Sequence, residues 1–360
     1  MASPLSDELS MDEYSLSSSV LLIGTIIPEE PLPQEKNSLS DLKRDENLWF
    51  EDGSIVLATD VHLFCVHKSI LANNSSVFKD MLAMPSGGGT GSSDEEDTYE
   101  GKPVVKMVGD SDDDVRYLLM ALYNHNFFRA NNPTTAPILL SLLYASSKYD
   151  VPAIRSEVIK HLKSYYADEL PKLRKCDLKD LVFGSDSSSD VDNDFDVKDF
   201  AFQLLSAGLR ANLKEQLPTM YMECAGHPPK RILRLSNKFS LGNDVIGNIL
   251  SGREKLSKWP YFFAANVFSP QLDCNFITCW ETRSTALFDW IIKNQNHREL
   301  TRRITVEGVP CFIKEELSKK ICADCLKRAD TLFADVKSKF WPDLPKIFGL
   351  GTWEDLKKSV

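Results

Sequence analysis

Four cysteines in two close pairs are the residues of this sequence whose type and spacing could support metal or redox chemistry. The pairs are Cys274-x4-Cys279 and Cys322-x2-Cys325. A structural zinc ion takes four thiolate or imidazole ligands in a tetrahedron, and two close pairs along the chain typically supply them. The second pair has good spacing for this purpose, and the first is a little longer. One interpretation is therefore a structural zinc site in the C-terminal half.

Two other interpretations of these cysteines stay open. Helical periodicity places Cys322 and Cys325 on one face beside Ile321 and Leu326. Cysteine is among the most buried residue types, so all four would then be core residues. The closer pair could instead be redox-active, although it lacks the strand-to-helix setting of a thioredoxin-like motif.

Other catalytic patterns are missing from the sequence. It has no Gly-x-Ser-x-Gly elbow, no His-Glu-x-x-His, no phosphate loop and no dinucleotide fingerprint. None of the six histidines stands beside a Cys or Ser in a recognisable nucleophile context; they are His62, His67, His125, His161, His227 and His297. We therefore expect no enzyme and no cofactor other than the zinc considered above. The enzymatic alternative is a thiol- or zinc-dependent activity in the C-terminal half.

The charge is unevenly distributed and argues against a nucleic-acid partner. The 360-residue chain has a formal net charge of −10, of which residues 1–40 carry −6 (seven acids, one Lys) and residues 86–101 carry −5 (five acids, no base). Everything else nets about +1 (−10 minus −11). The folded surfaces should be near neutral and mixed, without the basic stripe of a nucleic-acid footprint.

The lack of secretory and membrane signals in the sequence predicts a protein of the cytoplasm, the nucleus or both. The N-terminus is acidic and lacks the basic region of a signal peptide. The longest early apolar run, Val20–Ile27, is far too short to span a bilayer. Eight cysteines in 360 residues are not disulfide density, so reduced thiols are expected. We predict neither secretion nor a membrane partner.

Composition divides the chain into four parts. Residues 1–40, rich in Ser, Pro and Glu, are expected to be disordered. Residues 41–170 form a first domain, interrupted by an acidic Gly/Ser insertion at 85–101. An acidic Ser/Asp linker at 183–196 leads to residues 197–360, which we expect to be a mainly helical domain of unknown function.

The first domain should combine a hairpin with several helices. Short apolar runs on either side of Thr59-Asp60 predict the hairpin, and the polar pair His67-Lys68 in "LFCVHKSIL" marks the change to a helical period. Asn73-Asn74 and Ser75 indicate a helix stop and a new N-cap. A strand over Pro103–Val108 and helices beginning near Ser111, Pro137 and Pro152 complete the domain.

The C-terminal half carries two helical stripes separated by an aromatic stretch. We interpret Lys258–Pro270 and Asp273–Trp280 as β-like or irregular. The first stripe is Phe200, Leu204, Leu205, Leu209 and Leu213; the second is Leu317, Ile321, Cys325, Leu332, Val336 and Phe340.

This order of elements resembles the fungal-type BTB/POZ domain. The motifs that carry the resemblance cover about residues 40–167; they are "WFEDGSIVL" (Trp49–Leu57), "FCVHKSILANNSSVFKDML" (Phe64–Leu82), "LLMALYN" (Leu118–Asn124) and "LLYASSKYDVPAI" (Leu142–Ile154). The tail Cys322–Leu356 resembles the end of fungal BTB-containing proteins with a helical C-terminal region. The resemblance implies an α+β fold, a small sheet with flanking helices, followed by a mainly α-helical domain.

The same resemblance implies a non-enzymatic protein-protein interaction module. The partner-binding residues it points to line a shallow pocket around the His-Lys step: Asp52, His67, Lys68, Phe78 and Tyr123. One version of this function is a substrate adaptor for a cullin-type ubiquitin ligase. The alternative is a scaffold or transcription-related protein without a ubiquitin role.

Two kinds of partner known for the family, a second copy of the chain and a cullin, each depend on a recognisable segment of the sequence. BTB homodimers usually pack a helix that precedes the first strand, and only Ser38–Asn47, about two turns long, is available for it here. Cullin-binding members often carry an apolar-x-Glu signature, and the nearest match is Thr98-Tyr99-Glu100. A homodimer and a cullin scaffold are the partners considered.

Overall fold

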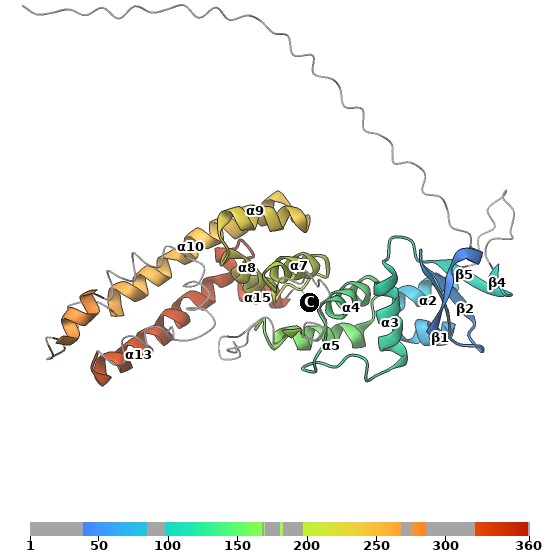
Figure 1. The fold of residues 1–360 in the computed structure, drawn as a ribbon, viewed down its shortest axis with the longest axis horizontal. Helices are drawn as coiled ribbons and strands as arrows, with labels where there is room; N and C mark the ends of the chain where they lie inside the picture. The colour runs from blue at the N-terminus through green and yellow to red at the C-terminus, as the bar shows by residue number, and fades with distance from the viewer. Residues whose placement is uncertain are drawn as a thin grey trace, which may run out of the picture. The chain divides into compact units, whose positions relative to one another are not determined.

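The computed structural model describes residues 39–84, 98–167, 169, 181–182, 197–267, 274, 276, 278–285 and 321–358. The predicted N-terminal disordered segment up to residue 38, most of the 85–101 insertion and the 183–196 linker lie outside the described residues. The described part has an N-terminal region of sheet and helices followed by a mainly helical region, as the sequence predicts (Figure 1).

A five-stranded mixed sheet forms the N-terminal region. Its strands are β1 (Lys43–Trp49), β2 (Ile55–Ala58), β3 (His62–Val66), β4 (Thr98–Tyr99) and β5 (Lys102–Lys106), in the spatial order β1-β3-β2-β5-β4. Strands β2 and β3 are the predicted antiparallel hairpin, with Ile55 opposite Val66 and Ala58 opposite Leu63. Strand β1 runs parallel to β3, and β5 runs parallel to β2.

Five helices accompany the sheet, and their starts follow the predicted signals. They are α1 (Lys68–Asn74), α2 (Ser76–Ala83), α3 (Asp112–Tyr123), α4 (Ala136–Lys148) and α5 (Pro152–Lys163). The Ser75 hydroxyl accepts a hydrogen bond from the Phe78 N–H at 2.9 Å, and Ser111 does the same for Asp114 at 3.1 Å. Both serines are therefore N-caps, as expected.

Side chains cover both faces of the sheet, which explains why β2 and β3 are almost continuously apolar. Alternate residues such as Leu57 and Phe64 join the main core with the helices. The opposite face, formed by Val56, Ala58, Leu63 and Cys65, is covered by the partly buried side chains of Leu39, Leu42, Trp49, Tyr99 and Val104.

Two segments differ from the sequence prediction in this region. Ser38–Asn47 was the segment available for a helix before the first strand, but from Leu39 the chain forms a 3₁₀ turn at Leu39–Asp41 and then begins β1. The end of the expected flexible insertion, Thr98–Tyr99, is a short strand paired antiparallel with β5. The β1 sequence "KRDENLW" is mostly charged, so its strand conformation comes from parallel pairing with β3 and not from an alternating apolar pattern.

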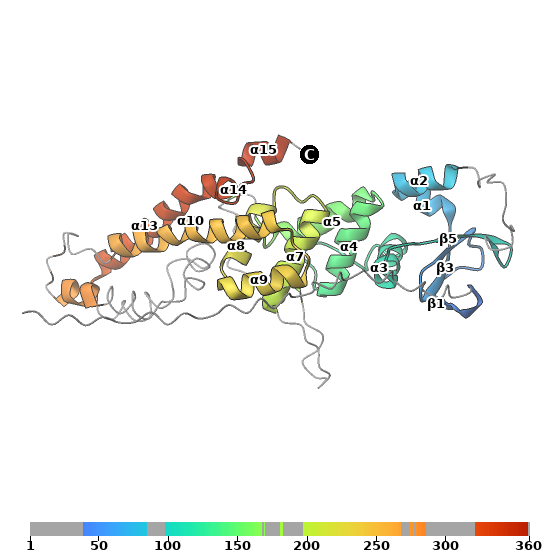
Figure 2. The ribbon, with the colours of Figure 1, turned by 90° about the horizontal axis from the view of Figure 1, so that it is seen from above.

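The C-terminal region is built from helices around a second part of the core. These are α7 (Val197–Arg210), α8 (Leu217–Ala225), α9 (Pro229–Lys238), α10 (Asn243–Val267), α13 (Ala323–Phe340), the 3₁₀ turn η5 (Trp341–Asp343), α14 (Leu344–Ile347) and α15 (Trp353–Lys358). Helices α10 and α13 lie side by side, and α8 packs on α10 (Figures 1 and 2).

The first aromatic stretch is helical from Lys258 to Val267, so the β-like or irregular interpretation is wrong there; in the second, Cys274 and Phe276 are irregular as expected and 278–280 are helical. Helix α10 continues through Pro260 as far as Val267, and residues 278–285 are also helical. Proline removes one helical hydrogen bond, but the neighbouring Trp259 ring packs 6.2 Å from the Phe340 ring of α13. Trp259 therefore packs between α10 and α13, whereas Phe262, Phe276 and Trp280 are exposed.

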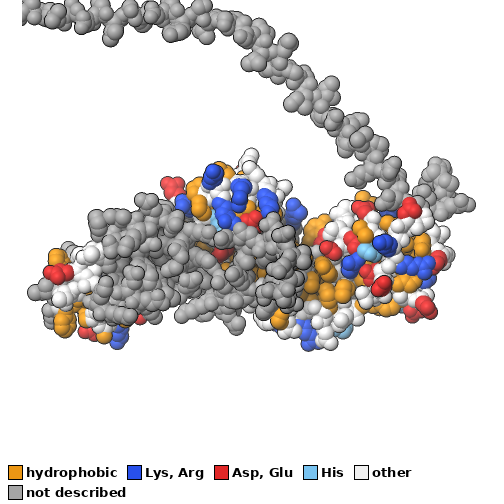
Figure 3. Space-filling view, in the orientation of Figure 1, with side chains coloured by type: hydrophobic (Ala, Val, Ile, Leu, Met, Phe, Trp, Pro, Cys, Tyr) orange, Lys and Arg blue, Asp and Glu red, His pale blue; other side chains and the backbone are white. Residues whose placement is uncertain are grey.

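The surface charge of the described residues is mixed, with one local exception. Figure 3 shows acidic and basic side chains interspersed over the N-terminal region and basic side chains gathered over α9. Helix α9 carries Lys230, Arg231, Arg234 and Lys238, although Arg231 and Lys238 both pair with Asp199 of α7, at 2.9 and 3.0 Å. Among the described helices, none combines the length and hydropathy needed to cross a membrane.

Candidate functional site

The first candidate site lies where β3 ends and α1 begins, around His67. The backbone N–H of His67 donates to the Tyr123 hydroxyl at 2.8 Å, and the same hydroxyl lies 2.9 Å from His67 Nδ1. The other ring nitrogen, Nε2, lies 3.2 Å from Asp52 Oδ1. If the Tyr123 O–H donates to Nδ1 and the ring proton of His67 is on Nε2, each of these contacts pairs a donor with an acceptor. Three of the predicted residues therefore form one polar group, in which Tyr123 is hydrogen-bonded to His67 and His67 lies within ion-pair distance of Asp52.

An aromatic side chain holds this arrangement together. The Phe50 ring stacks on the Tyr123 ring at 4.6 Å, with 18° between the planes, and lies 5.3 Å from the His67 ring. Burial is the main cause that raises the pKa of the Tyr123 hydroxyl, so the hydroxyl stays protonated and can donate. Phe50 was not among the predicted site residues. Its position in "WFEDG", directly before the turn that carries Asp52, is the sequence feature that could have indicated it.

The turn that presents Asp52 requires a glycine. The Gly53 N–H donates to the Phe50 carbonyl at 3.0 Å and closes the turn against β3. A Cβ on Gly53 would meet both the Cys65 sulfur and the Phe50 carbonyl oxygen inside contact distance. Glycine is thus the residue that lets the turn approach β3 and bring Asp52 within reach of His67.

The remaining two predicted residues lie in different surroundings. Lys68 is exposed, and its backbone N–H donates to the Ser54 hydroxyl at 3.0 Å. Phe78 is fully buried at 0% exposure and stacks on the Tyr149 ring at 4.6 Å. Because it points from α2 into the core, Phe78 offers a partner no surface in this structure. The accessible candidate surface, which we call the His67 surface, consists of Asp52, His67, Lys68 and Tyr123.

The apolar-x-Glu match lies elsewhere on the sheet, at β4. Glu100, its acidic residue, forms an ion pair with Arg44 of β1. The Arg44 guanidinium also lies over the Trp49 ring, 4.4 Å from its centroid. The acid that a cullin signature would offer is therefore already engaged within the chain.

The sheet, its hairpin and the five helices agree with one family of domains. Comparison with family models matches residues 49–166 to the BTB/POZ domain. Residues 49–166 form a BTB/POZ domain. Comparison with curated proteins and with solved structures found no match for the chain. The match identifies the domain and leaves its subfamily open.

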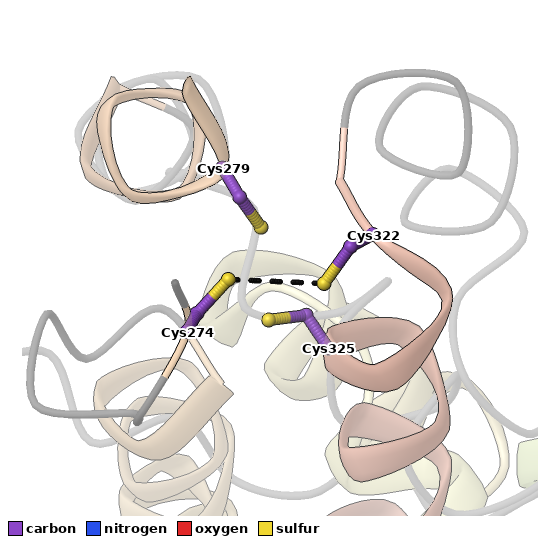
Figure 4. A group of neighbouring side chains, drawn as sticks. All are labelled: Cys274, Cys279, Cys322 and Cys325. Carbon is purple, nitrogen blue, oxygen red and sulfur yellow. Dashed lines mark hydrogen bonds between the residues drawn. The ribbon is translucent and has the colours of Figure 1, made fainter. Parts of the chain in front are cut away.

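The second candidate site lies outside the BTB domain, where the four paired cysteines come together. Their sulfur atoms all lie within 4.8 Å of one another, and the Cys274 and Cys322 sulfurs are 3.8 Å apart. Figure 4 shows the four side chains converging from separate segments. Cys279 comes from the helical segment 278–285, Cys325 from the first turn of α13, and Cys322 from the residue just before α13. We call this group the cysteine cluster.

The surroundings act differently on the individual thiols. Chiefly because the Cys325 backbone N–H can bond to the Cys322 sulfur, the pKa of the Cys322 thiol falls to about 7. Burial is the largest cause that raises the pKa values of Cys279 and Cys325. Cys322 therefore ionises more readily than Cys279 and Cys325.

A buried arginine accompanies the cysteine cluster. Arg283 follows Cys279 by one helical turn, and its positive charge favours ionisation of Cys325. The side chain is 1% exposed. Among the described residues, none provides a hydrogen-bond partner for its three guanidinium nitrogens. Sequence reasoning missed Arg283, because nothing in its spacing distinguishes it from other arginines.

Proposed function

We propose that this protein is a non-enzymatic adaptor whose BTB domain binds one protein partner while the helical C-terminal region engages a second. The observation that carries the proposal is the BTB/POZ domain over residues 49–166, a type of domain that mediates protein partnerships. The His67 surface is the contact region we assign to the first partner. A hydrogen-bonded and stacked surface is pre-organised, so little conformational entropy is lost when a partner binds.

The chemistry of the His67 surface supports recognition more than catalysis. Asp52, whose side chain is 85% exposed, presents a negative charge, and the neighbouring exposed Lys68 presents a positive one. Opposite charges arranged around a partly buried aromatic group suit a protein surface with complementary charge. Tyr123 and His67 use their polar atoms to fix the surface, which leaves the two charged residues to contact the partner.

The first partner we propose is the N-terminal domain of a cullin, which would make the chain a substrate adaptor for a ubiquitin ligase. A specific observation favours the second candidate, a scaffold or transcription-related protein without a ubiquitin role. Glu100, in the nearest match to the cullin signature, is paired with Arg44. The two candidates differ in one measurable property, the affinity for a cullin.

A binding titration of the full-length chain against a cullin N-terminal domain from the same organism separates the candidates. Sedimentation of the same sample gives the oligomeric state and shows whether the chain forms the homodimer that some family members form. Micromolar or tighter binding supports the adaptor. Absence of binding by a well-folded sample removes the ubiquitin-ligase version and leaves the scaffold.

A further inference from the structure

We propose that Cys274, Cys279, Cys322 and Cys325 together bind one zinc ion. The inference concerns the C-terminal region and does not depend on the identity of the BTB partner. Its basis is the geometry of the cysteine cluster and the buried arginine beside it.

The spacing of the sulfurs fits a single metal ion. Four Zn–S bonds of about 2.3 Å in a tetrahedron place each pair of sulfurs about 3.8 Å apart. The Cys274 and Cys322 sulfurs already have that separation, 3.8 Å. The largest separation in the cluster, 4.8 Å, exceeds the ideal by about 1 Å, which small side-chain rotations can close.

Disulfide bonding describes the cluster less well. A disulfide joins two sulfurs at about 2.05 Å and leaves no reason for a second pair to converge on the same point. All four cysteines of the cluster are free thiols in the structure, and each lies within 4.8 Å of the other three. Mutual convergence of four sulfurs is the arrangement that a tetrahedral ion imposes.

Arg283 supplies an independent observation, because its buried charge needs a negative partner. An arginine at 1% exposure whose guanidinium nitrogens find no hydrogen-bond partner among the described residues is costly in a protein interior. Zinc binding by four thiols releases their four protons and gives a complex of charge −2. That charge, one helical turn from Arg283 on the Cys279 side, would stabilise the guanidinium, and Arg283 would in turn reduce the net charge of the site.

The zinc ion would connect two distant parts of the sequence. Cys274 and Cys279 lie near the helical segment 278–285, and Cys322 and Cys325 lie at the start of α13. The ion would therefore fix the N-terminal end of α13 to the segment that follows α10. Because structural zinc is bound by the folded state and not by the unfolded chain, its removal should loosen this end of the C-terminal region.

The test begins with the metal content of the full-length chain, purified without chelators in the presence of a reductant that does not bind metal. The metal is quantified by plasma mass spectrometry. We expect about one zinc ion per chain, in line with a single four-thiolate site. The double variant C322S/C325S should lose the zinc, and the matched variant C224S, which changes a buried cysteine of α8, should retain it.

A second measurement keeps the proposal testable if the double variant fails to fold. Apo wild-type chain, prepared with a chelator under anaerobic conditions, is titrated with Co²⁺. We expect saturation at one equivalent, with sulfur-to-cobalt charge-transfer bands and the intense visible bands of tetrahedral cobalt, and displacement of the cobalt by zinc. R283M should lose the metal to a competing chelator at a lower chelator concentration than R283K, which keeps the positive charge.

Four results would overturn the proposal. They are a wild-type chain that takes up neither zinc nor cobalt, zinc retained in folded C322S/C325S, iron in place of zinc in the purified chain, or an intact mass showing disulfides among the four cysteines in a freshly reduced and then metal-supplemented sample.

Discussion

At the scale of single residues, the Tyr123 hydroxyl is the atom on which the His67 surface depends. It contacts both the backbone N–H and the ring Nδ1 of His67, whereas its ring makes the stacking contact with Phe50. These two contributions can be separated, because phenylalanine keeps the ring and removes only the hydroxyl. The strand-to-helix junction should then retain its shape but lose its hydrogen bonds.

Tyr123→Phe should lower the free energy of unfolding by about 1–2 kcal/mol, since it leaves the partly buried His67 N–H without its partner. Urea denaturation of the two proteins measures the difference. The control is Tyr144→Phe on α4, whose half-buried hydroxyl makes no hydrogen bond to the described residues and should change stability by less than about 0.5 kcal/mol. Equal effects of the two substitutions would contradict the role given to Tyr123.

His161 of α5 makes the stability of the domain depend on pH. It is 3% exposed, its Nδ1 accepts a hydrogen bond from the Asn131 N–H at 3.0 Å, and its Nε2 lies 2.9 Å from the Leu181 carbonyl oxygen. Burial is the main cause that lowers the pKa of His161, and the bond to Leu181 opposes it in part. Protonation of Nδ1 would break the bond from Asn131, so the folded state holds the neutral ring.

The free energy of unfolding should therefore decrease as the pH falls below about 6.5, the pKa of histidine in an unfolded chain. Below that pH the unfolded chain binds a proton that the folded chain excludes, until the lower folded pKa is reached. Denaturation at several pH values between about 7.5 and 5 measures the slope. His161→Gln, which can keep both hydrogen bonds without a charge, should flatten it. His125→Gln, at an exposed position, should leave it unchanged.

At the scale of helices and strands, two N-cap serines differ in what surrounds them. Ser111 caps α3 at the surface through the Asp114 N–H. Ser75 caps α2 in the same way but is 2% exposed, and its hydroxyl also donates to the Tyr149 carbonyl that ends α4. Ser75 therefore joins two elements, whereas Ser111 begins one.

Ser111→Ala should cost about 1 kcal/mol, the usual loss for an N-cap. Ser75→Ala should cost about 2–3 kcal/mol, because it also leaves the Tyr149 carbonyl unpaired in the core. Chemical denaturation of both variants provides the comparison. A smaller loss for Ser75→Ala than for Ser111→Ala would show that the link to Tyr149 contributes nothing.

Helix α10 contains two glycines whose replacement should have opposite effects. A Cβ at Gly247 meets nothing within 4 Å, whereas a Cβ at Gly252 would overlap the ring of Phe348, which follows α14. Gly247→Ala should raise stability by about 0.5–1 kcal/mol through helix propensity. Gly252→Ala should lower it by about 1–3 kcal/mol through overpacking. Thermal unfolding of the pair measures both, and a stabilising Gly252→Ala would contradict the packing of Phe348 on α10.

The elements that the sequence predicted correctly are those with local signals. The β2–β3 hairpin has apolar runs around Thr59-Asp60, and α3 has a capping serine followed by three acids in its first turn. The elements that were missed depend on distant partners. Strand β1 is charged and pairs with β3 across the hairpin sequence, and the helical course of α10 past Pro260 is accompanied by packing against α13.

The candidate sites divide in the same way. The sequence placed Asp52, His67 and Tyr123 together through their family motifs, and in the structure Tyr123 is hydrogen-bonded to His67 and Asp52 lies 3.2 Å from the His67 ring. The same motifs put Phe78 among the partner-binding residues, but its side chain is buried, because an apolar residue of α2 can face either the core or a partner. Spacing pointed to the cysteine pairs, but their convergence, and the burial of Arg283 beside them, depend on tertiary structure.

At the scale of the whole molecule, the chain combines a BTB domain with a helical region that is joined to it by packing of α7 on α4 and by polar contacts. The Arg155 guanidinium of α5 donates to the Ala211 carbonyl at 3.0 Å, and Lys163 pairs with Glu215 at 2.7 Å. Both contacts join α5, the last helix of the BTB domain, to the segment between α7 and α8 of the helical region.

The most direct test of the adaptor account is the affinity of the full-length chain for a cullin N-terminal domain, measured by calorimetry for wild type, Lys68→Glu and Lys357→Glu. Both lysines are exposed, but Lys68 belongs to the His67 surface and Lys357 to α15. The account predicts micromolar or tighter binding by wild type, a loss of about tenfold or more for Lys68→Glu, and wild-type affinity for Lys357→Glu. Absence of binding by folded wild type, or equal affinities for all three proteins, would contradict it.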